Sequence, residues 1–318
     1  MSAISELSSL KVKKARTPEE RAARRKEAGR DNKAGYLFLL PWLIGLVVIT
    51  IGPLLASLYL SFTDYNLIQS PNFVGVENYL RMLGDERLHN ALRVTLIYVF
   101  VSTPLQLGLA LGVAMLLNEG MKGLPFYRSV FYLPSMLGSS VAIALLWRQI
   151  FGTEGLVNQV LRLFGVDATT GWVSDPKYAL WTIILLHVWT FGSPMVIFLA
   201  GLRQIPGMYY EAAAVDGATR KTIFTKITLP LLSPIIFFNL VLQIINAFQA
   251  FTQAFVVSGG TGGPSDSTMF YTVYLYQRGF GQFQMGYAAA MAWLLVVIIA
   301  AFTAINFFAS KYWVFYGD

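Results

Sequence analysis

The sequence contains no cysteine, and this excludes disulfide bonds, thiol catalysis and thiolate metal sites in the 318 residues. Histidine occurs only at His89 and His187, so a histidine-rich metal site is excluded as well, and we expect no cofactor on this chain. Charged residues make up 13% of the chain, whereas a soluble domain has about 25%. Because 55% of the residues are hydrophobic, the composition indicates a membrane protein.

Charge-free stretches divide the chain into candidate membrane spans. Each stretch reaches the roughly 18–20 residues that a helix needs to cross a bilayer. The sequence therefore predicts an all-α, polytopic membrane bundle of six transmembrane helices. The charge-free runs cover residues 34–63, 94–118, 129–147, 178–202, 227–265 and 279–310.

The first 33 residues form a basic arm that holds ten lysines and arginines. The arm is too long and too charged for a cleaved signal peptide, so we expect residues 34–63 to be retained as the first helix. A basic arm beside a membrane span fixes orientation and contacts anionic lipid, so the positive charge does not indicate a nucleic-acid partner. We predict a tail at residues 1–33, one transmembrane domain at residues 34–318, and both termini in the cytoplasm.

A polar segment interrupts the apolar runs at residues 206–230. Pro206 and Gly207 predict a turn, and Met208 to Asp216 reads as a short helix. Gly217 follows at the point where a left-handed helix cap is needed, which glycine adopts without steric cost. Residues 219–226 predict a second short helix, and proline is tolerated near the start of the fifth span.

The spacing within this segment resembles the EAA loop of ABC-importer permeases. The string is Glu-Ala-Ala, three residues, Gly, nine residues and Ile-x-Leu-Pro. The resemblance implies that the segment Glu211–Thr219 docks on a separate ATPase. For any one of these residues taken alone, the alternative is that it belongs to an ordinary connection between two spans. The residues assigned to ATPase coupling are Glu211, Ala212, Ala213, Asp216, Gly217, Ala218, Leu229 and Pro230.

Other segments are similar to the carbohydrate-uptake subfamily of these permeases, among them residues 125–134, 155–158 and 262–264. The resemblance covers residues 36–310 and implies the fold of a type I ABC-importer permease in a prokaryotic inner membrane. It also implies three kinds of partner. These are a homologous EAA permease that completes a heterodimer, two ABC ATPase subunits, and an extracytoplasmic solute-binding protein. The chain has no Gly-x-x-x-x-Gly-Lys-Ser/Thr loop, so ATP and Mg²⁺ are expected on the ATPase.

Amide side chains in the fifth span are the candidates for contact with substrate. Gln243, Asn246, Ala250 and Gln253 share one helical face, and amides with flanking aromatic rings suit a sugar. The alternative is that these amides join helices to one another. The Gly192-Ser-Pro194 sequence predicts a kink in the fourth span. The residues assigned to the substrate pathway are Gln243, Asn246, Gln249, Ala250, Gln253, Phe248, Trp189 and Ser193.

Two other function classes compete with the permease. A stand-alone secondary transporter or channel would usually hold carboxylates or cations within its spans, and the six runs hold none. A membrane enzyme would need a catalytic constellation, and no Ser/His/Asp set or paired intramembrane carboxylates occur. We therefore predict a transport subunit that is not itself an enzyme. A sugar or oligosaccharide is the expected substrate, and a glycerol-phosphate-type polyol is the alternative.

Overall fold

The computed structural model describes residues 35–120, 123–166 and 169–315, and the basic arm at residues 1–33 lies outside them. The chain divides into two units, Met1–Tyr59 and Leu60–Asp318. The described part of the first unit belongs to one apolar helix, Gly35–Leu60. This helix includes a π-helical turn, η2 (Leu46–Ile51), and continues as α2 (Gly52–Leu60).

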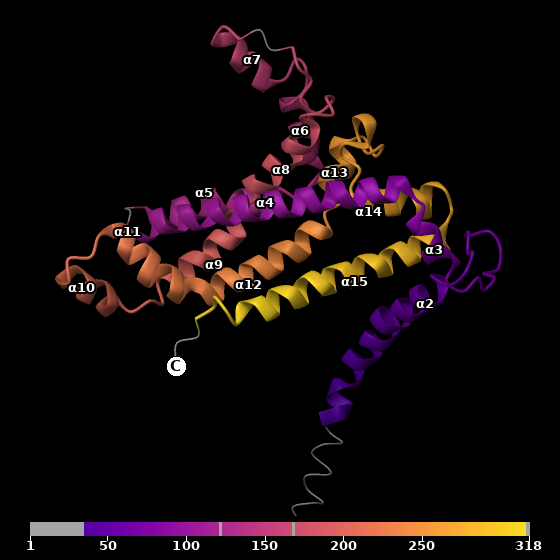
Figure 1. Cartoon of the computed structure of the whole chain (residues 1–318), viewed down its shortest axis with the longest axis horizontal. Helices are drawn as coiled ribbons and strands as arrows, with labels where there is room; N and C mark the ends of the chain where they lie inside the picture. The colour runs from indigo at the N-terminus through magenta and orange to yellow at the C-terminus, as the bar shows by residue number, and fades with distance from the viewer. Residues whose placement is uncertain (1–34, 121–122, 167–168, 316–318) are drawn as a thin grey trace, which may run out of the picture. The chain divides into compact units, whose positions relative to one another are not determined.

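The second unit is helical throughout its described secondary structure (Figure 1). Its elements are α3 (Glu77–Leu83), α4 (Glu86–Asn118), α5 (Leu124–Leu137), α6 (Val141–Ile150), α7 (Leu156–Leu163), α8 (Ala179–Trp189), α9 (Gly192–Leu202), α10 (Gly207–Val215), α11 (Arg220–Ile223), η3 (Phe224–Thr228), α12 (Leu229–Phe248), α13 (Thr252–Val257), η4 (Pro264–Asp266), α14 (Tyr271–Tyr276), η5 (Gln277–Gly281) and α15 (Met285–Ser310).

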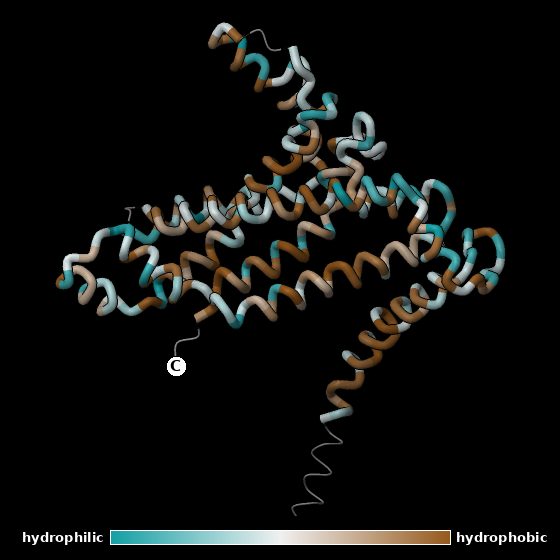
Figure 2. Tube along the Cα trace, viewed as in Figure 1, coloured by the Kyte–Doolittle hydropathy of each residue, from teal (hydrophilic) through white to brown (hydrophobic). Residues whose placement is uncertain are grey.

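Six membrane spans are present if each bent helix pair counts as one span. Four helices are long and apolar enough to cross alone, at residues 35–60, 86–118, 220–257 and 285–310. The two bent pairs are α5 with α6, at 96°, and α8 with α9, at 40°. The predicted all-helical membrane bundle is confirmed. The run at residues 129–147, which was expected to be one spanning helix, is sharply bent. Figure 2 shows the apolar residues along α12 and α15 and polar residues at the ends of the bundle.

Helix α4 is the centre of the second unit and packs against α8, α9 and α12. Its start is fixed by Asp85, whose carboxylate accepts a hydrogen bond from the Leu88 N–H. Small residues let neighbouring helices approach closely, and Ala91, Ala110 and Ala114 are completely buried. Gly201 serves the same purpose on α9, because a Cβ there would lie 2.1 Å from Ile235 Cδ1 of α12.

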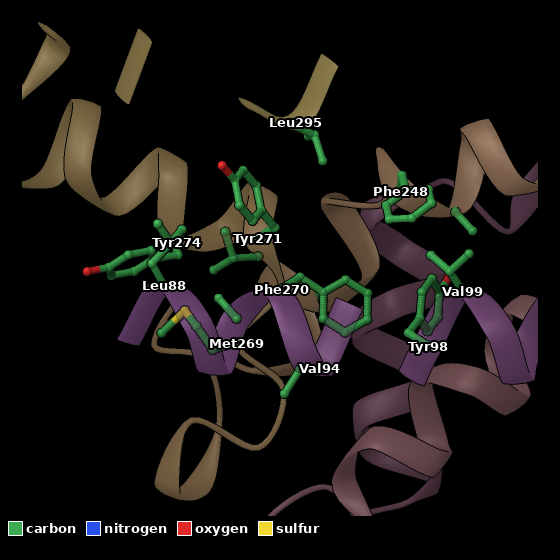
Figure 3. Close-up of a cluster of buried hydrophobic side chains, with 14 of the residues drawn as sticks. Leu88, Val94, Tyr98, Val99, Phe248, Met269, Phe270, Tyr271, Tyr274 and Leu295 are labelled. Carbon is green, nitrogen blue, oxygen red and sulfur yellow. The ribbon is translucent and has the colours of Figure 1, made fainter. Parts of the chain in front are cut away.

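Two hydrophobic clusters fill the bundle, and α4 contributes to both. In the larger cluster the Tyr98 ring lies against Phe270, with their centroids 4.6 Å apart (Figure 3). The smaller cluster joins α4 to α9 through Leu107, Phe198 and Leu202, towards α10 and α11. We call the end of the bundle that carries α10 and α11 the coupling end, and the end that carries α3 and α14 the opposite end (Figure 1).

Candidate functional site

A polar cavity of about 220 Å³ lies where three helical breaks meet. The breaks separate α5 from α6, α8 from α9 and α12 from α13. Each break leaves backbone groups without their usual helical partners, so polar side chains are needed nearby. Within the described part of the chain, no residue of the lining carries a carboxylate, an ammonium or a guanidinium group. The lining residues are Tyr98, Gln106, Ser135, Ser139, His187, Thr190, Ser193, Pro194, Gln243, Asn246, Ala250 and Gln253.

Side-chain hydrogen bonds tie the three breaks to one another. The Ser135 hydroxyl donates to the Thr190 carbonyl at 2.8 Å and accepts from the Ser193 N–H at 2.9 Å, which joins α5 to the α8–α9 break. The Gln253 Nε2 donates to the Gly138 carbonyl at 3.1 Å, which joins the α12–α13 break to the α5–α6 break. These hydrogen bonds therefore connect the three breaks into one continuous lining of the cavity.

Gln106 of α4 and His187 of α8 place hydrogen-bonding atoms without partners in this cavity. Gln106 Nε2 donates to the His187 and Thr190 carbonyls at 3.1 and 3.2 Å, whereas its buried Oε1 has no partner in the described structure. His187 presents its ring edge to Tyr98, and its buried Nε2 also has no partner there. A buried polar atom without a partner costs about 1–3 kcal/mol, so both atoms are suited to a ligand or to water.

The sequence prediction did not include Gln106, because an isolated glutamine in an apolar helix shows no pattern. The His187 ring is packed against Tyr98, and its Nε2, which has no partner in the described structure, lies in the polar cavity.

The residues predicted for the substrate pathway fall into two groups. Gln243, Asn246, Ala250, Gln253 and Ser193 all line the cavity.

Three other predicted residues lie outside the cavity. Gln249 follows the end of α12 and faces a separate hollow lined by α15. Phe248 is completely buried against Phe302, with their ring centroids 5.4 Å apart. Trp189 stacks near Trp147 at 6.0 Å. The shared helical face of the fifth span was predicted on the assumption of one continuous helix. In the structure the backbone leaves the helix at residues 249–251.

The segment after α9 has the predicted helix, cap and helix. Gly217 has a φ of 71°, which confirms the left-handed cap. The Ala218 N–H bonds to the Ala213 carbonyl at 2.9 Å, and the Gly217 N–H to the Ala214 carbonyl at 3.1 Å, so α10 ends in a Schellman motif. Thr219 then caps α11 through the Thr222 N–H. From Arg220 the helix runs through η3 into α12, so Leu229 and Pro230 lie inside a longer helix than expected.

Helix α10 presents an exposed surface. Glu211, Ala212 and Asp216 are exposed, whereas Ala213 is buried against the rest of the segment. Val215 is 89% exposed and Met208 is 68% exposed, and such apolar side chains at a helix surface are typical of an interaction site. Glu211 has no ion pair with any residue that the structure describes.

The opposite end of the bundle is fixed by a buried carboxylate, Asp85. It accepts hydrogen bonds from the Tyr274 and Tyr287 hydroxyls, at 2.7 and 2.8 Å to Oδ2, and pairs with Arg278 at 3.1 Å. Burial alone would raise the pKa of Asp85, but these hydrogen bonds, one from the Leu88 N–H and the Arg278 charge together lower it below 3.8. Burial and the hydrogen bond to Asp85 raise the pKa of Tyr274 to about 12.

Four to six candidate spans in the described residues, an uncharged polar cavity and an exposed helix between spans define a membrane permease. Residues 123–312, more than half of the chain, match the family described as "Binding-protein-dependent transport system inner membrane component". The chain belongs to this family and is the permease subunit of an ABC importer of the carbohydrate-uptake type, as the EAA resemblance predicted. It is a multi-pass inner-membrane protein and is not itself the ATPase.

Relatives and solved structures agree with this assignment. The chain is 53% identical over 288 residues to the probable ABC transporter permease protein YesP of Bacillus subtilis, covering 90% of this chain and 93% of YesP. It is 31% identical to the lactose transport system permease protein LacF of Rhizobium radiobacter, with coverage of 87% and 94%. A chain of a bacterial alginate ABC transporter, solved with a periplasmic protein bound to an alginate pentasaccharide, has the same fold. The TM-score is 0.75 at 22% identity, over 90% of this chain and 96% of that chain.

Proposed function

We propose that this chain forms half of the translocation pathway for a sugar or oligosaccharide. The observation that carries the proposal is the cavity at the helical breaks. Its amides, hydroxyls and imidazole can exchange hydrogen bonds with sugar hydroxyls, and its lining has no fixed charge to desolvate. The names of relatives support the same class, because they include permeases for lactose, for trehalose and maltose, and for multiple sugars.

The residues we assign to the substrate are those whose side chains reach the cavity. Gln243, Asn246 and Gln253 contribute amides from the fifth span, and Ser193 contributes a hydroxyl from α9. Ala250 leaves space beside them. Gln249, Phe248 and Trp189 are not included, because they contact α15, Phe302 and Trp147 instead.

A glycerol-phosphate-type polyol is the second candidate substrate. One relative, 32% identical, is an sn-glycerol-3-phosphate permease. A phosphate would need cationic groups beside it, and the described lining of the cavity itself offers none.

The assembly we propose has two different EAA permeases, two ATPase subunits and an extracytoplasmic solute-binding protein. The segment Glu211–Thr219, which holds the end of α10 and the cap at Gly217, would dock in a cleft of one ATPase, with both termini of the chain on the same cytoplasmic side. ATP-driven closure of the ATPase pair would displace α10 and open the cavity outward. Hydrolysis would return it, and the substrate would leave inward.

The experiment is purification of the complex from native membranes in mild detergent, followed by identification of every co-purifying chain. Wild type is expected to retain an ATPase subunit and a second EAA permease. Gly217→Pro is expected to lose the ATPase, because proline cannot adopt a positive φ and its nitrogen cannot donate to Ala214. Glu211→Ala is expected to insert normally but to transport less. Isolation of the chain alone, still able to transport, would refute the assembly and support a stand-alone carrier.

A further inference from the structure

A second hollow, of about 540 Å³, opens between α5 and α9 beside the polar cavity. Ser193 lines both spaces. From α5 and the break that follows it, the cavity uses Ser135 and Ser139, whereas the hollow uses residues one to two turns before Ser135, Ser129 and Tyr132. Helix α5 begins at the coupling end (Figure 1), so the hollow leads from the cavity towards α10 and α11.

Arg128 lines this hollow and lacks the partner that its chemistry requires. Its Nε is fully shielded from solvent, yet it has no hydrogen-bond partner in the described structure. The three ion pairs among the described residues join Arg87 to Asp266, Arg162 to Glu154, and Arg278 to Asp85, and none includes Arg128. The two terminal nitrogens of the guanidinium group remain available, and such a group normally binds a carboxylate or a phosphate, often through two parallel hydrogen bonds.

The hydroxyl groups around Arg128 complete a suitable environment for an anion. Ser129 donates its hydroxyl to the Pro125 carbonyl at 3.0 Å, whereas no hydrogen bond of the Tyr132 or Ser193 hydroxyl is present in the described structure. Two free hydroxyls beside one guanidinium can share the oxygen atoms of a single carboxylate or phosphate.

We propose that the hollow continues the substrate pathway to the coupling end, and that Arg128 makes this exit selective for anionic groups. The inference rests on the proposed function, because it gives the pathway its second half. The anion is a carboxylate or phosphate, carried by the transported sugar or by the headgroup of a neighbouring lipid. Arg128 and Ser193 line the hollow together.

The absence of cysteine from the sequence makes the test direct. Ser193→Cys introduces the only thiol of the chain at the point that both spaces share. The complete complex, purified with its ATPase, is treated with two methanethiosulfonate reagents of similar size, one with an anionic sulfonatoethyl group and one with a cationic trimethylammonioethyl group. The rate of modification of this chain is measured for each reagent, and their ratio reports the local field.

We expect Ser193→Cys to react with both reagents. Addition of Arg128→Gln should lower the ratio of the anionic to the cationic rate by about fivefold or more, because one nearby charge attracts one reagent and repels the other. Arg128→Lys should retain most of the wild-type ratio. High salt should reduce the difference, since mobile ions screen a charge that both reagents can approach from water. Leu163→Cys is the control, because Leu163 of α7 is 85% exposed and lies outside both the candidate spans and the hollow. Its ratio should not depend on Arg128.

The outcomes separate this inference from the proposed function. An unreactive Ser193→Cys in a complex that retains its ATPase would overturn the continuous pathway, and a ratio that does not respond to Arg128→Gln would overturn the anion site. Either result leaves the importer intact. With the anion site supported, comparison of nanodiscs with and without phosphatidylglycerol identifies the source. Slower anionic modification with phosphatidylglycerol assigns the site to a lipid headgroup and overturns the selective exit, whereas equal rates exclude the lipid headgroup and support an anionic group on the substrate.

Discussion

Substitution of Gly138 should disturb the closest contact between the two bent spans. A Cβ on Gly138 would lie 2.1 Å from Thr190 Cγ2 and 2.9 Å from the Pro134 carbonyl oxygen, whereas ordinary contacts are 3.4–4 Å. Thr190 cannot move freely, because its hydroxyl donates to the His187 carbonyl at 2.7 Å. Overpacking of this kind costs about 1–3 kcal/mol, so we expect Gly138→Ala to destabilise the complex by that amount.

The assay is thermal denaturation of the detergent-solubilised complex, followed by size-exclusion chromatography. The expected decrease in apparent Tm is about 2–8 °C. Thr190→Ser removes the clashing methyl group but keeps the hydroxyl, so the double variant should recover part of the loss, with a coupling energy of about 1 kcal/mol. Gly112→Ala is the control, because a Cβ there meets nothing within 4 Å. An unchanged Tm for Gly138→Ala, or purely additive effects with Thr190→Ser, would refute the packing described for the breaks.

Three further predictions concern the cavity, the cap and the opposite end. Gln243→Leu should raise the KM for uptake of the transported sugar about tenfold, since a hydrogen bond to a ligand contributes about 1 kcal/mol or more, whereas Gln249→Leu should not change the KM. Gly217→Ala and Gly165→Ala should cost a similar strain of about 1 kcal/mol, because both have positive φ and open surroundings, but only Gly217→Ala should lower transport-coupled ATP hydrolysis. The lowered pKa of Asp85 stabilises the fold above its ordinary value of 3.8, and this stabilisation is lost as the pH falls through the lowered pKa. Asp85→Asn should therefore lower the Tm at pH 7 and reduce the dependence of Tm on pH in the acid range. Equal acid sensitivity of variant and wild type would contradict that assignment.

The sequence predicted the elements that local chemistry determines. The cap at Gly217 follows from a glycine after a run of alanines, and the φ of 71° is the conformation that this pattern requires. The bend of 40° between α8 and α9 was expected from Gly192, Ser193 and Pro194. Both features depend on residues that are neighbours along the chain, so no knowledge of the packing was needed.

The features that were missed depend on contacts between distant residues. The bend of 96° after Gly138 has no proline at the break, and its close contact with Thr190 is visible only in three dimensions. Gln106 is surrounded by apolar residues in the sequence of its own helix. It lies in the cavity because α8 ends beside it, where the Gln106 side chain donates to the His187 carbonyl. Gln249 was assigned to the substrate pathway on the assumption of an unbroken helix. Because the helix breaks at residues 249–251, Gln249 lines the separate hollow beside α15 instead.

One continuous helix connects the exposed loop to the cavity. From Arg220 the chain stays helical through η3 and α12 to Phe248, with no loop between. Arg220 and Gln243 are therefore separated by roughly 35 Å along this one helix, at 1.5 Å per residue. A tilt of about 5° at the loop would displace Gln243 and Asn246 by roughly 3 Å, about the length of a hydrogen bond. A small movement of the loop at one end of this helix is therefore enough to make or break the amide contacts of Gln243 and Asn246 at the other end.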